Sequence, residues 1–379
     1  MESVPHSAPN QRLHQIAMAR QAVLHDGKSM SRTGTQPWIE RSWQRCLASG
    51  KTPDQKVSFD MIAPTARQRL VEANQALLRT ARPVLQSLSQ AIASTRYFAV
   101  MTDAQGVVID AHGAIDRSDR RADLITRIGT DLSESRLATT AISAALTELQ
   151  PVWLHRGEHF FDTNSVYSCA GAPLFGPDGA CIGMLDLTGI EAAERPELKH
   201  LVAQSARSIE NALTLSQLKS NSDLLIRLNW PGRTLGDETD GLVCLNADGY
   251  VTAANQMARI MVPQLLPQLT APDKSVLHAS DLFAMSFDML FDAARKQSGK
   301  SALEVPLWTG LRLHALPVLG AQAGAQSDQP AAPPHLRDVE TALILKAVAD
   351  ARGNVMQAAK ALGISRATVY RRLGSGLKR

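Results

Sequence analysis

The sequence predicts a multidomain α+β protein that ends in a small all-α module. From about residue 77, short apolar runs bounded by turn residues alternate with amphipathic helical stretches, which is typical of antiparallel sheets with flanking helices. This pattern stops at residues 319–335, a segment rich in Gly, Ala, Gln and Pro that we interpret as a flexible linker. Only helix signals follow it, so the fold class changes at this point.

The composition restricts the class of protein. With 44% hydrophobic and 20% charged residues, the 379-residue chain can bury ordinary cores in two or three domains. No apolar run reaches the ~18 residues of a membrane span, and the first residues do not resemble a secretion signal. The four cysteines form no Cys-x-x-Cys pair, so neither a disulfide framework nor a zinc site is predicted. We therefore expect a cytoplasmic protein.

The charge is unevenly distributed along the chain. Residues 335–379 hold nine Lys and Arg against three acidic residues, a net charge of +6, whereas the whole chain carries +4. A basic module on a nearly neutral body is expected of a nucleic-acid-binding protein. The charge alone equally suits a solvated basic tail, so the pattern inside the module has to decide.

The first part of the chain predicts helices followed by a mixed domain. Residues 1–70 are expected to form a helical segment, in which Trp38–Leu47 ends before Gly50, a suitable C-cap. Further helices are predicted over Leu77–Ala93 and Ser133–Leu149. The predicted strands are Tyr97–Met101, Val107–Ala111, Pro151–Leu154, Val166–Leu174 and Cys181–Leu187. Together they predict an α+β domain over residues 71–215.

A long helical segment over Glu194–Leu228 follows this domain. It exceeds the usual ~11–12 residues, so it either covers the sheet alone or also pairs with its copy in a dimer. Residues 216–235 are expected to be a connecting helix and linker, and residues 236–318 a second, smaller α+β module. Its predicted strands form two hairpins, Leu242–Leu245 with Tyr250–Ala253 and Leu303–Leu307 with Leu311–Leu316.

The last module, residues 336–379, predicts three capped helices. They cover Asp338–Ala351, Val355–Leu362 and Arg366–Leu373. Asn354 and Ser365 are suitable N-caps, and Gly363 permits the positive φ that a tight turn requires. Two short helices joined by such a turn are a helix-turn-helix, whose second helix lies in the major groove of DNA. Arg366, at the start of that helix, is expected to contact a guanine.

The module resembles the Fis-type helix-turn-helix. The matching text is Gly353-Asn354-Val355, Ala358-Ala359, Leu362-Gly363-Ile364-Ser365-Arg366 and Thr368-Val369-Tyr370-Arg371-Arg372-Leu373. The resemblance implies base contacts from Ser365 and Arg366, phosphate contacts from Thr368, Arg371 and Arg372, and a dimer on a palindromic operator. The predicted DNA-binding residues are Asn354, Ser365, Arg366, Thr368, Tyr370, Arg371 and Arg372.

The body of the chain resembles the N-terminal half of the acetoin-catabolism regulators, which are GAF-domain activators of the sigma-54-dependent type. The matching segments are Arg41-Ser42-Trp43-x-Arg45-Cys46, Gly129–Glu134, Gly157-Glu158-His159-Phe160, Cys169–Leu174 and Gly183–Gly189. The resemblance implies that residues 71–215 form a GAF sensory domain. The family usually has a Gly-Thr-Asn-like sequence where this chain has Ala138-Thr139-Thr140. If that segment lines the ligand cavity, a different effector is implied.

Residues 241–255 resemble the opening of a PAS domain, which implies that the second module is PAS-like and either binds a ligand or acts as a dimerising spacer. Relatives of this type place an ATPase domain before the helix-turn-helix, but this chain has no Gly-x-x-x-x-Gly-Lys-Ser/Thr loop to hold phosphates. The linker occupies that place. A regulator without ATP hydrolysis is implied, acting by recruiting RNA polymerase, by repressing, or by competing with a full-length relative.

No catalytic arrangement is predicted, so we expect neither an enzyme nor a cofactor. His155 and His159 are four residues apart, but Gly157 interrupts the helix that a zinc site would require. We expect instead a small organic effector between the first sheet and its helices. The candidate lining residues are His159, Phe160, Tyr167, Cys169, Met184 and Asp186.

Two functional hypotheses follow from the sequence. The first is a dimeric, effector-responsive, DNA-binding transcription regulator. The alternative is a GAF/PAS signalling or adaptor protein that works mainly through protein partners, with the basic tail incidental. Substitution of Arg366 separates them, because only the first predicts loss of specific DNA binding.

Overall fold

The computed structural model describes residues 9–27, 35–219, 222–266, 277–296, 302–320 and 355–357. The chain divides into two compact units, residues 1–323 and residues 324–379. In the second unit residues 355–357 are described, and they are helical. The linker predicted over residues 319–335 begins too early, because Leu319 is the last residue of a strand, and its residues 321–335 lie outside the described residues. The predicted recognition helix also lies outside them.

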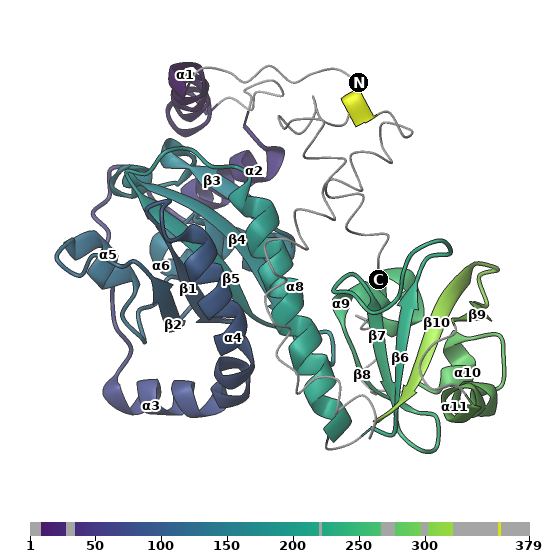
Figure 1. Cartoon of the computed structure of the whole chain (residues 1–379). Helices are drawn as coiled ribbons and strands as arrows, with labels where there is room; N and C mark the ends of the chain where they lie inside the picture. The colour runs from purple at the N-terminus through teal and green to yellow at the C-terminus, as the bar shows by residue number, and fades with distance from the viewer. Residues whose placement is uncertain are drawn as a thin grey trace. The chain divides into compact units, whose positions relative to one another are not determined.

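The first domain of the first unit contains an antiparallel five-stranded sheet in the order β2-β1-β5-β4-β3 (Figure 1). Its strands are β1 (Tyr97–Asp103), β2 (Val108–Gly113), β3 (Val152–His155), β4 (Tyr167–Phe175) and β5 (Cys181–Ile190). All five strands were predicted from apolar runs and turn residues, and the α+β class of this domain is confirmed.

Helices cover both faces of this sheet. On one face α4 (Gln75–Ile92) and α8 (Leu198–Ser216) lie side by side. The other face carries α2 (Pro37–Ala48), α5 (Arg120–Ile125), α6 (Glu134–Leu137) and α7 (Ala141–Glu148). Because neighbouring strand residues point to opposite faces, the sheet separates two cores. Leu185 and Leu187 pack with α4 and α8, whereas Met184 packs with α7.

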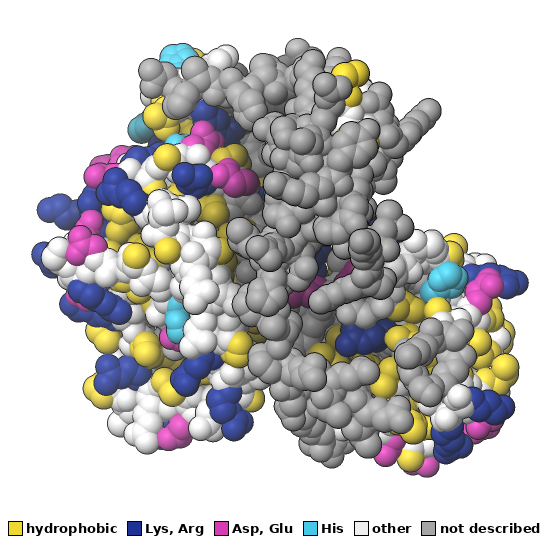
Figure 2. All heavy atoms as spheres, in the orientation of Figure 1, with side chains coloured by type: hydrophobic (Ala, Val, Ile, Leu, Met, Phe, Trp, Pro, Cys, Tyr) yellow, Lys and Arg dark blue, Asp and Glu magenta, His cyan; other side chains and the backbone are white. Residues whose placement is uncertain are grey.

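Shorter elements surround this domain. They are α1 (Pro9–Arg20), η1 (Gln21–His25), α3 (Pro64–Ala73), η2 (Arg156–Glu158) and η3 (Asp162–Val166). Helix α1 packs against η2, and α3 has no buried side chain. On the face of the molecule in Figure 2, basic and acidic side chains both occur over this domain.

The helix predicted over Ser133–Leu149 is wrong in its middle, because it is divided into α6 and α7. Ala138 separates them with φ 55° and ψ −141°, a conformation that L-residues other than glycine rarely adopt. Thr140 then caps α7, its Oγ1 accepting a hydrogen bond from the Ser143 amide at 3.1 Å. The apolar period across the break continues, so periodicity alone could not reveal it.

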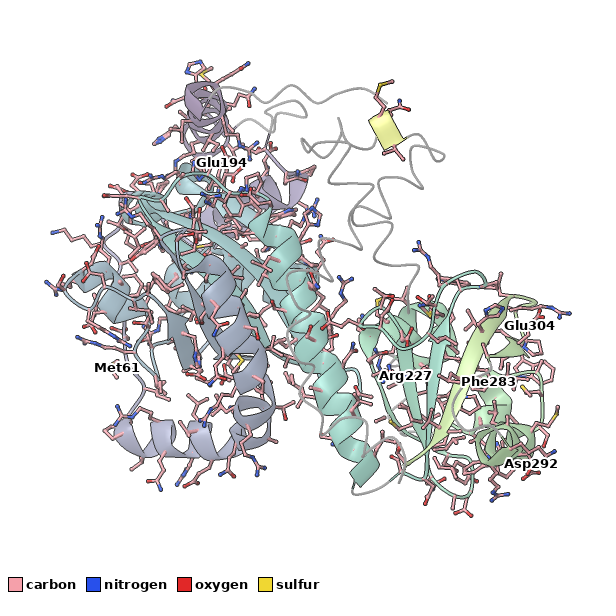
Figure 3. All side chains as sticks on the ribbon, viewed as in Figure 1. Met61, Glu194, Arg227, Phe283, Asp292 and Glu304 are labelled. Atoms are coloured by element: carbon pink, nitrogen blue, oxygen red, sulfur yellow. The ribbon has the colours of Figure 1, made fainter. Side chains whose placement is uncertain are left out.

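The second domain of this unit has its own antiparallel sheet, in the order β8-β7-β6-β10-β9. The strands are β6 (Leu224–Asn229), β7 (Gly241–Leu245), β8 (Val251–Ala254), β9 (Leu303–Pro306) and β10 (Arg312–Leu319). Helices α9 (Gln256–Met261), α10 (Ala279–Leu282) and α11 (Phe287–Lys296), with the turn η5 (Pro263–Leu265), contribute to its main core. Phe283, labelled in Figure 3, is fully buried in that core.

The helix predicted over Glu194–Leu228 is wrong beyond Lys219. Helix α8 ends at Ser216, the turn η4 (Gln217–Lys219) follows, and Leu224–Asn229 form the central strand β6. Alternate residues of β6 enter two different cores, Leu224 and Ile226 on one face and Leu225 on the other. The strand opens with three consecutive apolar residues and shows no alternation there, so its sequence cannot be distinguished from that of a buried helix.

Candidate functional site

A cavity lies between the first sheet and the helices that carry Leu137 and Ile142. Its volume is about 40 Å³, counted as space open to the centre of a water molecule, whereas one water needs ~10–15 Å³. The apolar lining residues are Phe59, Val100, Ile125, Leu132, Leu137, Ala141 and Ile142. The other lining residues are Thr140, His159, Asn164, Tyr167, Cys169, Asp186 and Thr188. The cavity is therefore lined by apolar side chains together with side chains that can form hydrogen bonds.

Asp186 is the one carboxylic acid among the described residues that line the cavity. Its side chain is buried, and burial raises the pKa of its carboxyl group to about 7. The Thr188 hydroxyl donates to Oδ2, but among the described residues no donor reaches the buried Oδ1. An unmade hydrogen bond of this kind costs about 1–3 kcal/mol. Oδ1 therefore retains the capacity for a further hydrogen bond.

His159 provides a complementary group from the loop between β3 and β4. Its Nδ1 donates to the carbonyl oxygen of Arg156 at 2.9 Å, so Nε2 is the nitrogen left to accept. Burial lowers the pKa of His159 to about 4, which keeps the ring neutral near pH 7. The ring also meets Tyr167 edge-on, with 6.4 Å between ring centroids. Asp186 Oδ1, when ionised, and His159 Nε2 can each accept one further hydrogen bond.

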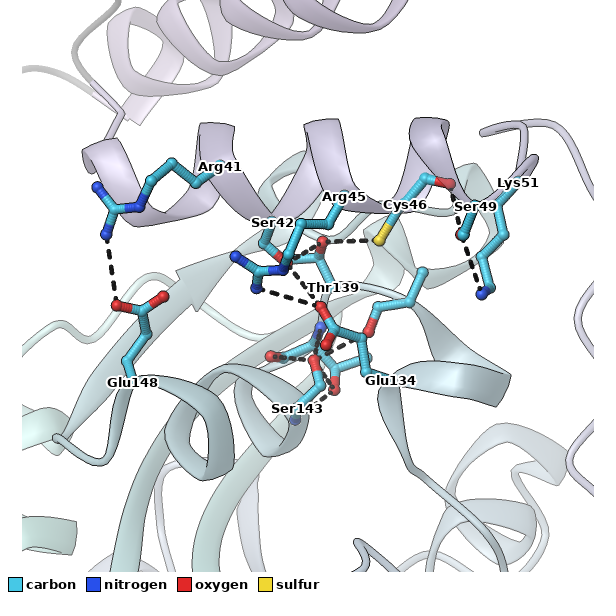
Figure 4. Close-up of polar contacts among 12 residues, drawn as sticks. Arg41, Ser42, Arg45, Cys46, Ser49, Lys51, Glu134, Thr139, Ser143 and Glu148 are labelled. Carbon is cyan, nitrogen blue, oxygen red and sulfur yellow. Dashed lines mark hydrogen bonds and ion pairs between the residues drawn. The ribbon is translucent and has the colours of Figure 1, made fainter. Parts of the chain in front are cut away.

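The helices α6 and α7, which line the cavity on the side away from the sheet, are held in place by contacts with α2 (Figure 4). Ser42 Oγ lies 2.8 Å from Thr139 Oγ1 and 3.2 Å from Glu134 Oε1, and Arg45 forms an ion pair with Glu134 at 3.3 Å. Cys46 Sγ lies 3.6 Å from Thr139 Oγ1. Two segments that are far apart in the sequence, Arg41–Cys46 and Gly129–Glu134, thus meet in space. Their contacts fix the helices that line the cavity.

The cavity brings together four of the six side chains predicted to line it, namely His159, Tyr167, Cys169 and Asp186. Phe160 and Met184 do not line it. Phe160 is buried in the same core with its ring edge-on to Phe161, and Met184 lies under α7 beside Gly171. Neighbouring lining residues were missed, although Thr188 is two residues from Asp186 on the same strand face.

The segment in which this chain departs from its relatives contributes directly to the site, because Thr140 lines the cavity. The predicted DNA-binding residues, from Asn354 to Arg372, lie outside the described residues. Among the described residues, no group of three or more His, Cys, Asp or Glu side chains could hold a metal ion. None of the described helices is long and apolar enough to cross a membrane.

Comparison with known proteins places this domain in a family. The model of the MimR N-terminal domain matches residues 16–211, just over half of the 379 residues. The chain belongs to the MimR N-terminal domain family. A second family model, described as bacterial regulatory protein of the Fis family, matches residues 335–374. The Fis-type resemblance seen in the sequence is therefore confirmed for this MimR-type chain.

Individual relatives agree with this assignment. The acetoin catabolism regulatory protein of Cupriavidus necator is 31% identical over 290 residues, 74% of this chain and 41% of its own length. The propane 2-monooxygenase operon transcriptional activator MimR of Mycolicibacterium goodii is 27% identical over 274 residues, 71% of this chain and 43% of its own. The MimR-type chain thus spans about two fifths of the length of these curated relatives.

A solved structure also matches. The crystal structure of the E. coli DhaR(N)–DhaL complex matches with a TM-score of 0.45 and 16% identity, covering 75% of this chain and 99% of that chain.

Proposed function

We propose that this chain is a DNA-binding transcription regulator whose activity is set by a small organic effector in the cavity of its GAF-type domain. The observation that carries the proposal is the combination of a Fis-family match at residues 335–374 with a cavity lined by Asp186, whose buried Oδ1 has no hydrogen-bond partner among the described residues. The net charge of +6 over residues 335–379 supports contact with DNA phosphates. A DNA-binding regulator of this kind acts in the cytoplasm, where the bacterial chromosome lies.

The effector is a small, uncharged molecule that carries a hydroxyl group. Neither Lys nor Arg is among the cavity's lining residues, so a carboxylate ligand would lack a counter-charge and would face Asp186. A hydroxyl can instead donate to Asp186 Oδ1, and a second hydroxyl can donate to His159 Nε2. Relatives of the chain are named for acetoin catabolism and for a propane 2-monooxygenase operon, both of which involve small oxygen-bearing or hydrocarbon compounds.

On DNA, the chain acts as a homodimer on a palindromic operator, through Ser365 and Arg366 at bases and Thr368, Arg371 and Arg372 at phosphates. It acts without ATP hydrolysis of its own, because no phosphate-binding loop occurs in its sequence. Regulation then proceeds by contact with RNA polymerase or by occlusion of the promoter. ATP-dependent opening of a promoter by the purified chain would contradict this part of the proposal.

DNA binding is tested by capture of fragments of the source genome over a series of salt concentrations. The full chain is expected to retain specific fragments with an affinity that falls steeply with salt. A truncation ending at Ala332 and the variant Arg366→Ala are expected to lose this preference, whereas Arg295→Ala, which removes an exposed side chain of α11, is a matched control. If neither the full chain nor the truncation prefers any fragment, the protein is an adaptor that works through protein partners.

Effector binding is tested with a panel of three- to five-carbon alcohols, diols, hydroxyketones and carboxylates. We expect thermal stabilisation and ligand-observed NMR signals from a neutral, hydroxyl-bearing compound and none from the carboxylates. Asp186→Asn is expected to weaken that binding, and Asp292→Asn, an exposed carboxyl group on α11, to leave it unchanged. Equal binding of alcohols and carboxylates would contradict the proposed role of Asp186.

A further inference from the structure

The loop that brings His159 to the cavity is held from its outer side by the N-terminal segment. Arg20, the last residue of α1, is mostly buried, with 14% of its side chain exposed. Its Nη1 donates to the carbonyl oxygens of Gly157 and His159 at 2.8 and 2.6 Å. Its Nη2 donates to the carbonyl oxygen of Phe160 at 3.0 Å and to Asp162 Oδ1 at 2.5 Å. One guanidinium thus binds acceptors from four residues of the loop.

A second arginine of the same helix fixes the start of the loop. Arg12 Nη2 lies 2.5 Å from Glu158 Oε1, while Glu158 Oε2 accepts from the His155 amide at 2.7 Å. Glu194, labelled in Figure 3, lies 3.8 Å from Arg12 Nε. The indole of Trp43 donates to the Glu158 carbonyl at 3.0 Å. The loop is therefore bound by side chains more than a hundred residues away in sequence.

Gly157 lies close to helix α1, so a larger residue at this position would force neighbouring side chains to shift. A Cβ on Gly157 would lie 3.1 Å from Ile16 Cγ2 and 3.1 Å from Arg20 Cδ. The Arg20 side chain also lies over the Trp43 ring, 5.8 Å from its centre. Arg20 does not itself line the cavity. Its carbonyl acceptors and the His159 ring belong to the same short turn, so the position of the ring depends on the backbone that Arg20 binds.

We propose that Arg20 is a positioning residue for the effector site: by binding the 157–162 backbone, it sets the place of His159 in the cavity and makes docking of residues 9–25 part of effector recognition. The link to recognition rests on the proposed effector function. By linkage, an effector that contacts His159 favours the docked N-terminal segment to the same degree that docking favours the effector. Residues 9–25 thereby become a second place at which effector affinity can be changed.

The test uses the full, effector-free chain, so its result does not depend on whether an effector exists. Histidine side-chain NMR on ¹⁵N-labelled protein reports the tautomer and titration of His159, assigned with His159→Gln. In the wild type, we expect a neutral ring with the proton on Nδ1 down to about pH 5. In Arg20→Gln, we expect a mixture of tautomers, protonation at higher pH, and amide exchange in residues 157–162 at least about tenfold faster.

Arg295→Gln, which removes an exposed arginine of α11, is the matched control and is expected to leave these readings unchanged. Arg20→Lys retains the charge but not the planar fork, so it is expected to give an intermediate result, and it serves as the second variant if Arg20→Gln does not fold. A folded variant with the wild-type tautomer, titration and loop exchange would overturn the proposal. Failure of the compound panel alone would instead refute the effector function.

Discussion

Asp186→Asn removes a buried carboxyl group from the lining of the cavity and should change how the free energy of unfolding depends on pH. Burial raises the folded-state pKa of Asp186 to about 7, against an ordinary value of 3.8. Between these values the folded chain holds a proton that the unfolded chain has lost. Stability therefore falls as pH rises through this window, and the full penalty is present above about pH 7. Asparagine does not ionise and carries no such penalty.

The size of the effect follows from the two pKa values. They differ by about three pH units, and each unit corresponds to about 1.4 kcal/mol, so the penalty is about 4 kcal/mol. Because the side chain is 1% exposed, little solvent screening reduces it. The free energy of unfolding of Asp186→Asn minus that of the wild type should therefore increase by about 4 kcal/mol from pH 4 to pH 8. Any change in the hydrogen bond to Thr188 adds an offset that does not depend on pH.

The assay is urea unfolding followed by tryptophan fluorescence at four pH values between 4 and 8. Trp43, fully buried in the core beside the cavity, reports on the domain concerned. Asp292→Asn, whose carboxyl group is 55% exposed, is the control and should run parallel to the wild type. Parallel profiles for Asp186→Asn and the wild type from pH 4 to pH 8 would refute the reasoning, because Asp186 would then titrate alike in both states.

Three further predictions concern the same domain. Ser42→Ala should lower the free energy of unfolding by about 1–3 kcal/mol, because the buried Thr139 hydroxyl and the partly exposed Glu134 carboxylate each lose a partner. Ser49→Ala, on the exposed end of α2, is its control in urea unfolding and should cost less. Gly183→Ala should destabilise the domain by about 3 kcal/mol or more, since a Cβ would lie 2.2 Å from the Thr102 carbonyl oxygen; a loss under about 1 kcal/mol would contradict so close an approach. His159→Gln should remove a fall in stability between pH 6.5 and pH 4, because the folded pKa of about 4 leaves the proton to the unfolded chain. An unchanged profile in acid would show that His159 is accessible to protons in the folded state.

The first sheet could be predicted because its strands are short, apolar and separated by turn residues, each of which is a local signal. Strand β6 could not, since Leu224–Asn229 is buried on both faces and carries no alternation. The break at Ala138 was hidden for a different reason. Alanine is the best helix former, and its positive φ is imposed by the packing of α6 and α7 rather than by its own preference.

The candidate site was predictable where a chemical type stood out from its surroundings. Asp186 is an acid inside an apolar strand, and His159 follows a glycine and a glutamate in a loop, so both attract notice in the sequence. Phe160 directly follows His159, but successive residues of an extended segment point in opposite directions, so Phe160 does not line the cavity. Arg20 gives no sequence signal, because its role depends on contacts with residues 157–162, far along the chain.

Successive residues of β5 face opposite sides of the sheet. Mutations at neighbouring positions of this strand therefore affect different parts of the domain. Asp186 and Thr188 face the cavity, whereas Leu185 and Leu187 belong to the core beneath α4 and α8. A codon change at the first pair alters what the cavity can hydrogen-bond, and the opposite core keeps its packing. Under the proposed effector function, single substitutions on this strand can therefore change which compound the cavity binds while the scaffold stays the same.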